Sequence, residues 1–288
     1  MLNAEIRSNG NSEGQETKLY RKMNTDEDQE ILQKDLNNLQ KWSDDWLLKF
    51  HPNKCKVLQV KGSPNNRTYR LANQTGDVVL EKITNEKDLG VTVDTNLDFR
   101  THIQNSINKA NSVLGIIRRA FTFLDEPMFK QLFKALVRPH LEYAASAWSP
   151  YKLMDIQTLE NVQRRATKLL PGLKDLTYEE RLAKLKLPTI KHRRFRGDLI
   201  NVFKIVKKKF DEKVTSELFV FDKNERTRRH KFKLYKQRCC TELRRNSFTF
   251  RVVDSWDNLP EIVVNAETTK DFEILLDNHL KDNIYNNY

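Results

Sequence analysis

Cysteine, glycine and long apolar runs are scarce in this sequence of 288 residues. Its three cysteines, Cys55, Cys239 and Cys240, are an odd number, and the adjacent two make a poor disulfide pair. No stretch approaches the roughly 18 apolar residues that a membrane helix needs, and the first residues lack the apolar run of a signal peptide. We therefore expect an intracellular protein, nuclear or cytoplasmic, without a membrane partner.

The residue patterns of common catalytic and metal sites are missing as well. The eight glycines form no glycine-rich phosphate-binding loop. His230 lies nine residues before Cys239, which is not a spacing of zinc ligands. His140 and Ser146 share a helical stretch without a plausible oxyanion arrangement. The sequence therefore predicts no metal site and gives little support to a hydrolase.

Positive charge, by contrast, is abundant and unevenly distributed. Lys and Arg total 51 against 39 Asp and Glu, a formal net charge of +12. Residues 191–210 hold eight bases and one acid, and residues 223–245 hold ten bases and two acids, whereas residues 24–50 are acidic. This polarity favours a polyanionic partner such as RNA, DNA or an RNA–DNA hybrid. Solvated faces or a nuclear import signal would give the same pattern.

The N-terminal third is predicted to hold one helix and a few strands. Residues 1–16 are polar, and we expect them to be disordered. Thr25 and Asp28 resemble a capping box at the start of a helix, which His51-Pro52-Asn53 would end. Alternating apolar residues then indicate three or four short antiparallel strands between residues 56 and 94.

The rest of the chain is predicted to be helical, apart from a basic linker. Apolar residues at helical spacing form stripes that we expect in the core. The stripes are Ile31, Leu32, Leu36, Leu39, Trp42 and Trp46; Ile103, Ile107, Ala110, Leu114 and Ile117; Phe129, Leu132, Phe133, Leu136 and Val137; Ile156, Leu159, Val162, Ala166 and Leu169; Tyr178, Leu182 and Leu185; and Ile200, Phe203 and Val206. Residues 210–245 are poor in aliphatics and are predicted to be loosely packed, before a last helix from Lys270 to Leu280.

Seven stretches occur in an order and spacing that resemble one family. They read TKLYRK, LQKDLNNLQKWSDDWLLKFHPNKCKVL, EKDLGVTVDTNLDFRTHI, LVRPHLEYAASAWSP, LENVQRRATKLL, YEERLAKLKLPTIKHRRFRGDLI and NSFTFRVVDSWDNLPEIVV. Together they resemble the C-terminal part of the polyprotein of jockey-type non-LTR (LINE) retrotransposons, from about residue 17 to the end. Each stretch alone is weak evidence, but seven in order are specific.

The resemblance implies a division of the chain into parts of a reverse transcriptase. It implies a partial palm over 17–97, a helical thumb-like domain over 98–209 and a C-terminal helical region over 246–288, with 210–245 as the basic linker. The fold class is accordingly α+β, mainly α-helical, with short antiparallel strands of a partial palm followed by a thumb-like bundle.

The family copies RNA into DNA with two Mg²⁺ ions, which need closely spaced carboxylates. Its aromatic-Ala-Asp-Asp turn comes directly before TKLYR, and in this sequence that slot reads Glu13-Gly14-Gln15-Glu16. The Gln15 amide has no charge and binds Mg²⁺ poorly, and the longer Glu16 side chain moves the carboxylate. The family's other catalytic aspartate lies upstream of the matching region. The resemblance therefore implies that Mg²⁺ ligands are missing here.

One further position matches a family motif. Lys54 in HPNKCKVL is similar to the lysine near the phosphates of the incoming nucleotide, but without the metal site it has no reaction to assist. An ordinary turn lysine fits the same pattern. No residue is predicted to be catalytic.

The nucleic-acid-binding candidates come from two basic motifs, QRRATK and KHRRFR. They are Arg164, Arg165, Lys168, Arg193, Arg194 and Arg196. Arg164 and Lys168 share a helix face, although Glu160 is placed to pair with Arg164 at the surface. Arginines near a helix start are unfavourable against the helix dipole, which indicates a role beyond helix stability.

Three hypotheses follow. The first is a truncated, inactive LINE-type reverse transcriptase fragment that still binds nucleic acid without sequence specificity. The second is a fragment of an active RNA-directed DNA polymerase whose catalytic part is missing from this chain. The third is a relic without function, whose uncovered palm edge is an aggregation hazard.

Overall fold

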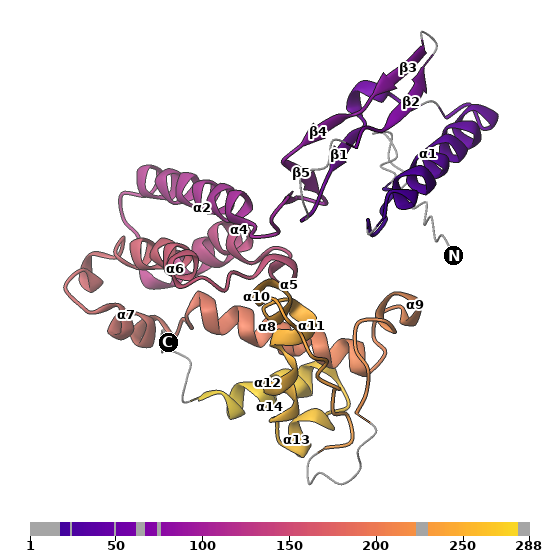
Figure 1. Ribbon diagram of the computed structural model, residues 1–288. Helices are drawn as coiled ribbons and strands as arrows, with labels where there is room; N and C mark the ends of the chain where they lie inside the picture. The colour runs from indigo at the N-terminus through magenta and orange to yellow at the C-terminus, as the bar shows by residue number, and fades with distance from the viewer. Residues whose placement is uncertain are drawn as a thin grey trace. The chain divides into compact units, whose positions relative to one another are not determined.

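The protein is mainly helical with a few short strands, as the sequence predicts. The computed structural model describes residues 18–23, 25–48, 50–61, 67–73, 76–222 and 230–281. The expectation of a disordered N-terminus falls outside these ranges. Two compact units are present: residues up to Lys87 with 93–96 form the first, and residues 88–92 with all those from Leu97 onward form the second (Figure 1). No helix in the described ranges is long and apolar enough to cross a membrane.

The first unit consists of one helix against short strands. Helix α1 (Glu27–Asp45) packs on β2 (Arg70–Asn73), which pairs antiparallel with β3 (Gly76–Val79). The side chain of Gln33 on α1 exchanges two hydrogen bonds with the backbone of Arg70, of 2.8 and 2.9 Å. This amide pairs with the edge strand as a neighbouring strand would, and so fixes the helix to the sheet.

The strand pairing differs from the sequence-based prediction. Strand β1 (Lys56–Leu58) runs parallel to β4 (Glu81–Ile83), with Lys56 opposite Glu81 and Leu58 opposite Ile83. Strands β5 (Asn85–Asp88) and β6 (Val91–Asp94) form a third pair. The prediction of three or four antiparallel strands is therefore wrong in number and in one pairing direction for the described residues.

The core of the first unit is small. Tyr69, Leu71 and Leu80 are its buried cluster, with Leu32 and Leu36 of α1 partly buried against it. Two residues of the predicted stripe are exposed, Ile31 by 38% and Trp46 by 66%.

The predicted capping box of α1 is half formed, because Asp28 accepts a hydrogen bond from the Thr25 backbone N–H while Asp26 occupies the N-cap position. The helix ends at Asp45, before His51-Pro52-Asn53, whose Pro52–Lys54 form a 3₁₀ turn.

The second unit is built from helices, and Figure 1 shows them from α2 to α14. They are α2 (Arg100–Ala120), α3 (Glu126–Leu132), a π-helical turn (Phe133–Val137), α4 (Arg138–Glu142), α5 (Ala145–Trp148), α6 (Leu153–Thr167), a 3₁₀ turn (Pro171–Leu173), α7 (Tyr178–Leu185), α8 (Ile190–Val206), α9 (Glu212–Thr215), α10 (Glu242–Arg245), α11 (Phe248–Arg251), α12 (Val253–Asp257), α13 (Glu261–Val264) and α14 (Thr269–His279). The predicted last helix is thus confirmed as α14.

Most predicted stripes lie in the core of this unit. All five stripe residues of α2 are buried, and so are those of α7 and α8. Leu136 is an exception and is half exposed. Helix α3 continues through the π turn into α4, whose second residue is Pro139. Proline has no N–H and its ring crowds the preceding turn, which the wider π turn accommodates.

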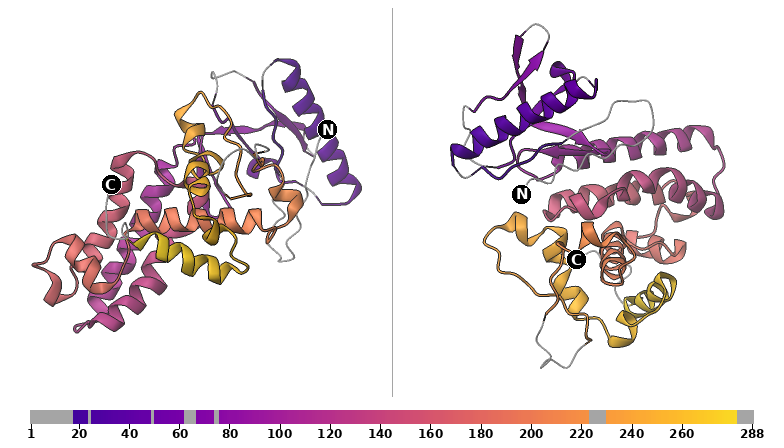
Figure 2. Two further views of the ribbon diagram at one scale, coloured as in Figure 1. Left: turned by 90° about the horizontal axis from the view of Figure 1, so that it is seen from below. Right: turned by 90° about the vertical axis from the view of Figure 1, so that its right-hand side faces the viewer.

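The C-terminal segments pack onto the second half of α8. Helix α14 lies alongside α8 in the views of Figures 1 and 2, and Phe272 stacks on Phe203 at 4.2 Å between ring centroids. The range 210–245, expected to be a loosely packed linker, contributes buried side chains to the same core in its described part, namely His230 and Leu234. Trp256 explains this packing, because its indole N–H donates to the Phe232 carbonyl and holds the segment in place.

Candidate nucleic-acid interface

Three of the six predicted binding residues gather on the outer face of α6. Arg164, Arg165 and Lys168 are exposed, whereas Val162 and Ala166 of the same helix are fully buried. We call these three the α6 basic surface. Together with Thr158 and Asn161 they line an open depression of about 510 Å³. Among the described residues, no carboxylate forms an ion pair with any of the three.

The arginines of this surface are partly held in position. The Arg164 guanidinium lies 4.6 Å from the ring centroid of Tyr178 on α7, and Tyr178 is itself fixed by a hydrogen bond from the Gln163 amide of 3.1 Å. The Arg165 Nε donates to the Asn161 carbonyl at 3.3 Å. A side chain restrained in this way loses less rotamer freedom when it binds a phosphate. Cations near a helix C-terminus also favour the helix itself, which accounts for part of this arrangement.

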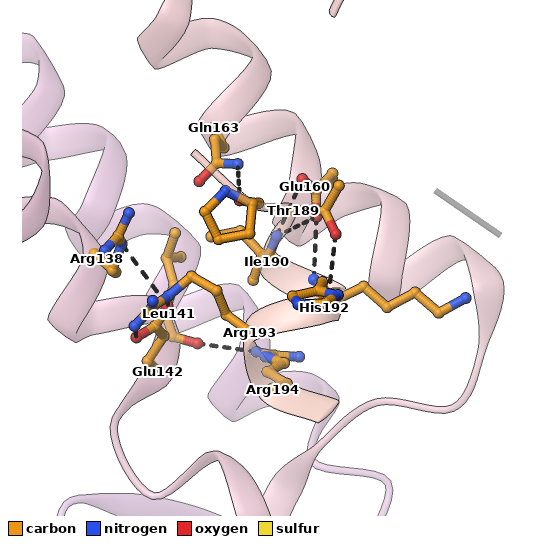
Figure 3. Close-up of polar contacts among 12 residues, drawn as sticks. Arg138, Leu141, Glu142, Glu160, Gln163, Thr189, Ile190, His192, Arg193 and Arg194 are labelled. Atoms are coloured by element: carbon orange, nitrogen blue, oxygen red, sulfur yellow. Dashed lines mark hydrogen bonds and ion pairs between the residues drawn. The ribbon is translucent and has the colours of Figure 1, made fainter. Parts of the chain in front are cut away.

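Glu160 does not form the surface pair with Arg164 that its spacing predicts. Its carboxylate is buried and accepts hydrogen bonds from the backbone N–H groups of Ile190 at 3.0 Å and Lys191 at 3.4 Å (Figure 3). The Tyr178 hydroxyl donates to it as well. The first N–H groups of α8 have no partner within the helix and carry partial positive charge, so they attract this carboxylate. Burial raises the pKa of Glu160, against the lowering effect of these hydrogen bonds.

Arg193 and Arg194 are bound inside the helical unit. Figure 3 shows both beside α4. Arg193 makes a two-pronged contact with Glu142, in which Nη2 lies 2.8 Å from Oε2. Arg194 is buried, donates to the Leu141 carbonyl at 3.0 Å and lies 4.3 Å from the ring centroid of Trp148. Burial lowers the pKa of Arg194 to about 10, so the side chain stays charged at neutral pH.

Arg196 pairs with the last helix. Its guanidinium contacts Asp277 at 3.0 Å and Glu273 at 3.2 Å, both on α14. The arginine motif at the start of α8 therefore joins α8 to α4 and to α14. These carboxylates offset the unfavourable position of the arginines near the helix N-terminus. The structure does not bring the six candidate residues together on one surface.

Sequence reasoning missed two cations at the end of α2, the helix that lies beside α6. Arg118 and Arg119 at the end of α2 are exposed and form no ion pair within the described residues. Helices α2 and α6 lie side by side (Figures 1 and 2), and Lys152 and Asp98, which precede them, form an ion pair of 3.6 Å. The two helices therefore begin together, so their basic ends lie toward the same end of the pair. The pair Arg118-Arg119 at the end of the predicted helix was the sequence feature that could have pointed to these two cations.

The catalytic positions of the resembled family receive no support from the geometry. Gln15 and Glu16 lie outside the described residues. In the described ranges no three His, Cys, Asp or Glu side chains are placed to hold a metal ion together, and Lys54 is an exposed residue of the 3₁₀ turn. The Ser146 hydroxyl donates to Asp198 at 2.8 Å and accepts from the Asn201 amide at 2.8 Å. Ser146 is thus part of a packing network, in which no histidine serves as its base.

Comparisons with known proteins add one distant relative. No protein-family model matches the chain, and no solved structure matches it. The uncharacterized protein B0403.1 of Caenorhabditis elegans is 27% identical over 110 residues, which are 37% of this chain. The matched segment spans 56% of that protein's length. A match of this size assigns neither a family nor an activity.

Proposed function

We propose that this chain binds nucleic acid through the phosphate backbone, with the α6 basic surface as its main contact. The observation that carries the proposal is the contrast between two sets of arginines. At the start of α8, Arg193 pairs with Glu142 and Arg196 with Asp277 and Glu273, while Arg194 is buried. Arg164, Arg165 and Lys168 are instead exposed at the end of α6, and no described carboxylate forms an ion pair with them. Unpaired cations on one face suit a row of phosphates.

The expected partner is RNA, DNA or an RNA–DNA hybrid, bound with little sequence preference. Phosphate contacts position a protein on a nucleic acid but carry no sequence information. The resemblance to jockey-type LINE reverse transcriptases supports this partner, because a thumb grips the template–primer duplex. Gln15 and Glu16 stand at the slot of the catalytic aspartates, so we propose that the chain by itself copies no RNA.

The test is fluorescence anisotropy of the purified chain with a labelled RNA–DNA hybrid at 50 and 200 mM salt. A protein with 6–10 phosphate contacts loses roughly 10³–10⁵ in affinity over this range. The triple variant R164Q/R165Q/K168Q should bind at least about tenfold more weakly, and its salt slope should fall by about 3 because three contacts are removed.

The control carries the same change in net charge elsewhere. K208Q/K236Q/K270Q removes three lysines from other parts of the chain and should leave hybrid affinity within about threefold of the wild type, because long-range charge effects are screened beyond about 10 Å. Equal losses in both triple variants would show that net charge alone drives binding. An unchanged affinity in R164Q/R165Q/K168Q would overturn the proposed surface.

A further inference from the structure

A second positive cluster lies near the C-terminal end of α8, around Phe232. The Lys207 ammonium, at the end of α8, lies 4.6 Å from the centroid of the Phe232 ring. The Lys231 ammonium lies 5.3 Å from the same centroid. At most about 10 Å therefore separates the two like charges, which is within the range of their repulsion at physiological salt.

No ion pair among the described residues offsets this repulsion. Neighbouring Lys208 and Lys236 pair with Glu212 and Asp254. In the described part of the chain no ion pair involves Lys207, Lys209 or Lys231. Burial lowers the pKa of Lys207, and the charges of Lys231 and Lys209 lower it further, while Glu267 is the carboxylate that opposes them.

A favourable interaction with the helix dipole explains only part of this cluster. Lys207 and Lys209 follow the C-terminus of α8, where positive charge stabilises a helix. Lys231 lies outside α8, on the segment that packs beside it, so it is not one of that helix's own terminal residues. Its position over the Phe232 ring adds a third cation to Lys207 and Lys209. Because the aromatic ring restrains Lys207 and Lys231, both would lose little freedom on binding an anion.

An exposed aromatic side chain follows Lys209 in the chain. Phe210 directly follows Lys209 and is 44% exposed. Lysines beside an exposed aromatic ring are the combination that binds single-stranded nucleic acid, because phosphates meet the cations while an unpaired base stacks on the ring. A duplex offers no unpaired base for such stacking. The cluster therefore suits a single strand better than a hybrid.

We propose that Lys207, Lys209, Phe210 and Lys231 form a second nucleic-acid site, which binds single-stranded RNA or DNA. We call this set the α8-end surface. It shares no residue with the α6 basic surface and stands independently of the function proposed above. One chain would then hold a duplex and an unpaired strand at two separate places on its helical unit.

The test uses the full chain and a labelled 12-nucleotide oligouridine, which has no secondary structure. K207Q/K209Q/K231Q should bind it at least about tenfold more weakly than the wild type, with a salt slope lower by about 2, since single strands contribute roughly 0.7 per phosphate contact. F210L keeps all charges and should lower affinity about fivefold or more at an unchanged salt slope, because it removes only stacking. K34Q/K41Q/K87Q removes three exposed lysines of the first unit, none next to the site in the chain; it is the charge-matched control and should bind like the wild type.

The outcomes separate the two proposals. We expect K207Q/K209Q/K231Q to retain hybrid binding and R164Q/R165Q/K168Q to retain most oligouridine binding. Absence of oligouridine binding at 50 mM salt, or equal loss in the charge-matched control, overturns the α8-end surface and leaves the α6 proposal untouched. Binding of the wild type to anionic phosphatidylserine vesicles but not to oligouridine would likewise overturn it, in favour of a membrane surface. A folded circular dichroism spectrum of each variant ensures that a loss reports on the site.

Discussion

At the scale of single residues, the burial of Glu160 leaves Arg164 without the surface ion pair that their spacing predicts. Its spacing of four from Arg164 predicts a surface ion pair, yet its carboxylate lies inside and joins α6 to the start of α8. Arg164 is consequently left for the ring of Tyr178 and for solvent. The cause is the N-terminus of α8, whose N–H groups need an acceptor that the helix itself cannot provide.

Replacing Glu160 should therefore destabilise the helical unit. Glu160→Leu leaves the Ile190 and Lys191 N–H groups without an acceptor in a buried place, and we expect a loss of about 2–4 kcal/mol in the free energy of unfolding. The measurement is urea denaturation followed by circular dichroism. Glu179→Leu, an exposed position on α7, is the control and should stay within about 0.5 kcal/mol of the wild type. Equal stability of both variants would contradict the structural role of Glu160.

At the scale of elements, Arg251 joins the C-terminal helices to α8. Its Nε donates to Asp198 Oδ2 at 2.9 Å and its Nη2 to Oδ1 at 3.1 Å, so α11 and α8 are connected by a two-pronged pair. Arg251 also donates to the carbonyl of Ser146 on α5 at 3.0 Å. Three elements distant in sequence thus meet at one guanidinium. Because this pair is mostly buried, removing one partner leaves the other charge uncompensated.

A double-mutant cycle tests this connection. Arg251→Met should cost about 3–5 kcal/mol, because Asp198 then stays buried and charged. Asp198→Asn should cost much less in the Arg251→Met background than in the wild type, since the unpaired charge disappears. Thermal unfolding of the four proteins provides the values. Arg245→Met, which breaks an exposed pair with Glu242, should cost less than about 1 kcal/mol. Additive costs in the cycle would refute the coupling.

At the scale of the whole molecule, the two units differ in the size of their cores. Tyr69, Leu71 and Leu80 are the buried cluster of the first unit. The second unit contains, in one of its clusters alone, Trp256, Phe203, Phe272 and a dozen further buried side chains. Buried apolar area is the main favourable contribution to folding, so the first unit should be the less stable one.

The four tryptophans report on this difference, because Trp42 and Trp46 lie in the first unit and Trp148 and Trp256 in the second. Urea unfolding monitored by tryptophan fluorescence should show two transitions, the earlier one from the first unit. The double variant W42F/W46F should lose the fluorescence change of the earlier transition and retain the later one. A single transition shared by all four tryptophans would mean that the units unfold as one.

The sequence by itself determined the helices of the second unit and much of its core. The stripes of α2, α7 and α8 repeat at helical spacing, and an amphipathic helix has only one face that it can bury, so periodicity is enough to name those core residues. The pattern also located the short strands. It could not decide their pairing, because three- and four-residue strands carry too little alternation to fix partner or direction.

Only the tertiary structure decided which charges are paired. QRRATK and KHRRFR look alike as basic motifs, yet the second is neutralised by Glu142 and by α14, which lies some eighty residues further along the chain. Long-range pairing of this kind leaves no local periodicity in a sequence. The same holds for Lys207 and Lys231, which meet across Phe232 because the segment around residue 231 packs against the end of α8. Composition predicted that this protein is cationic, and folding decided which of the described positive charges pair with carboxylates.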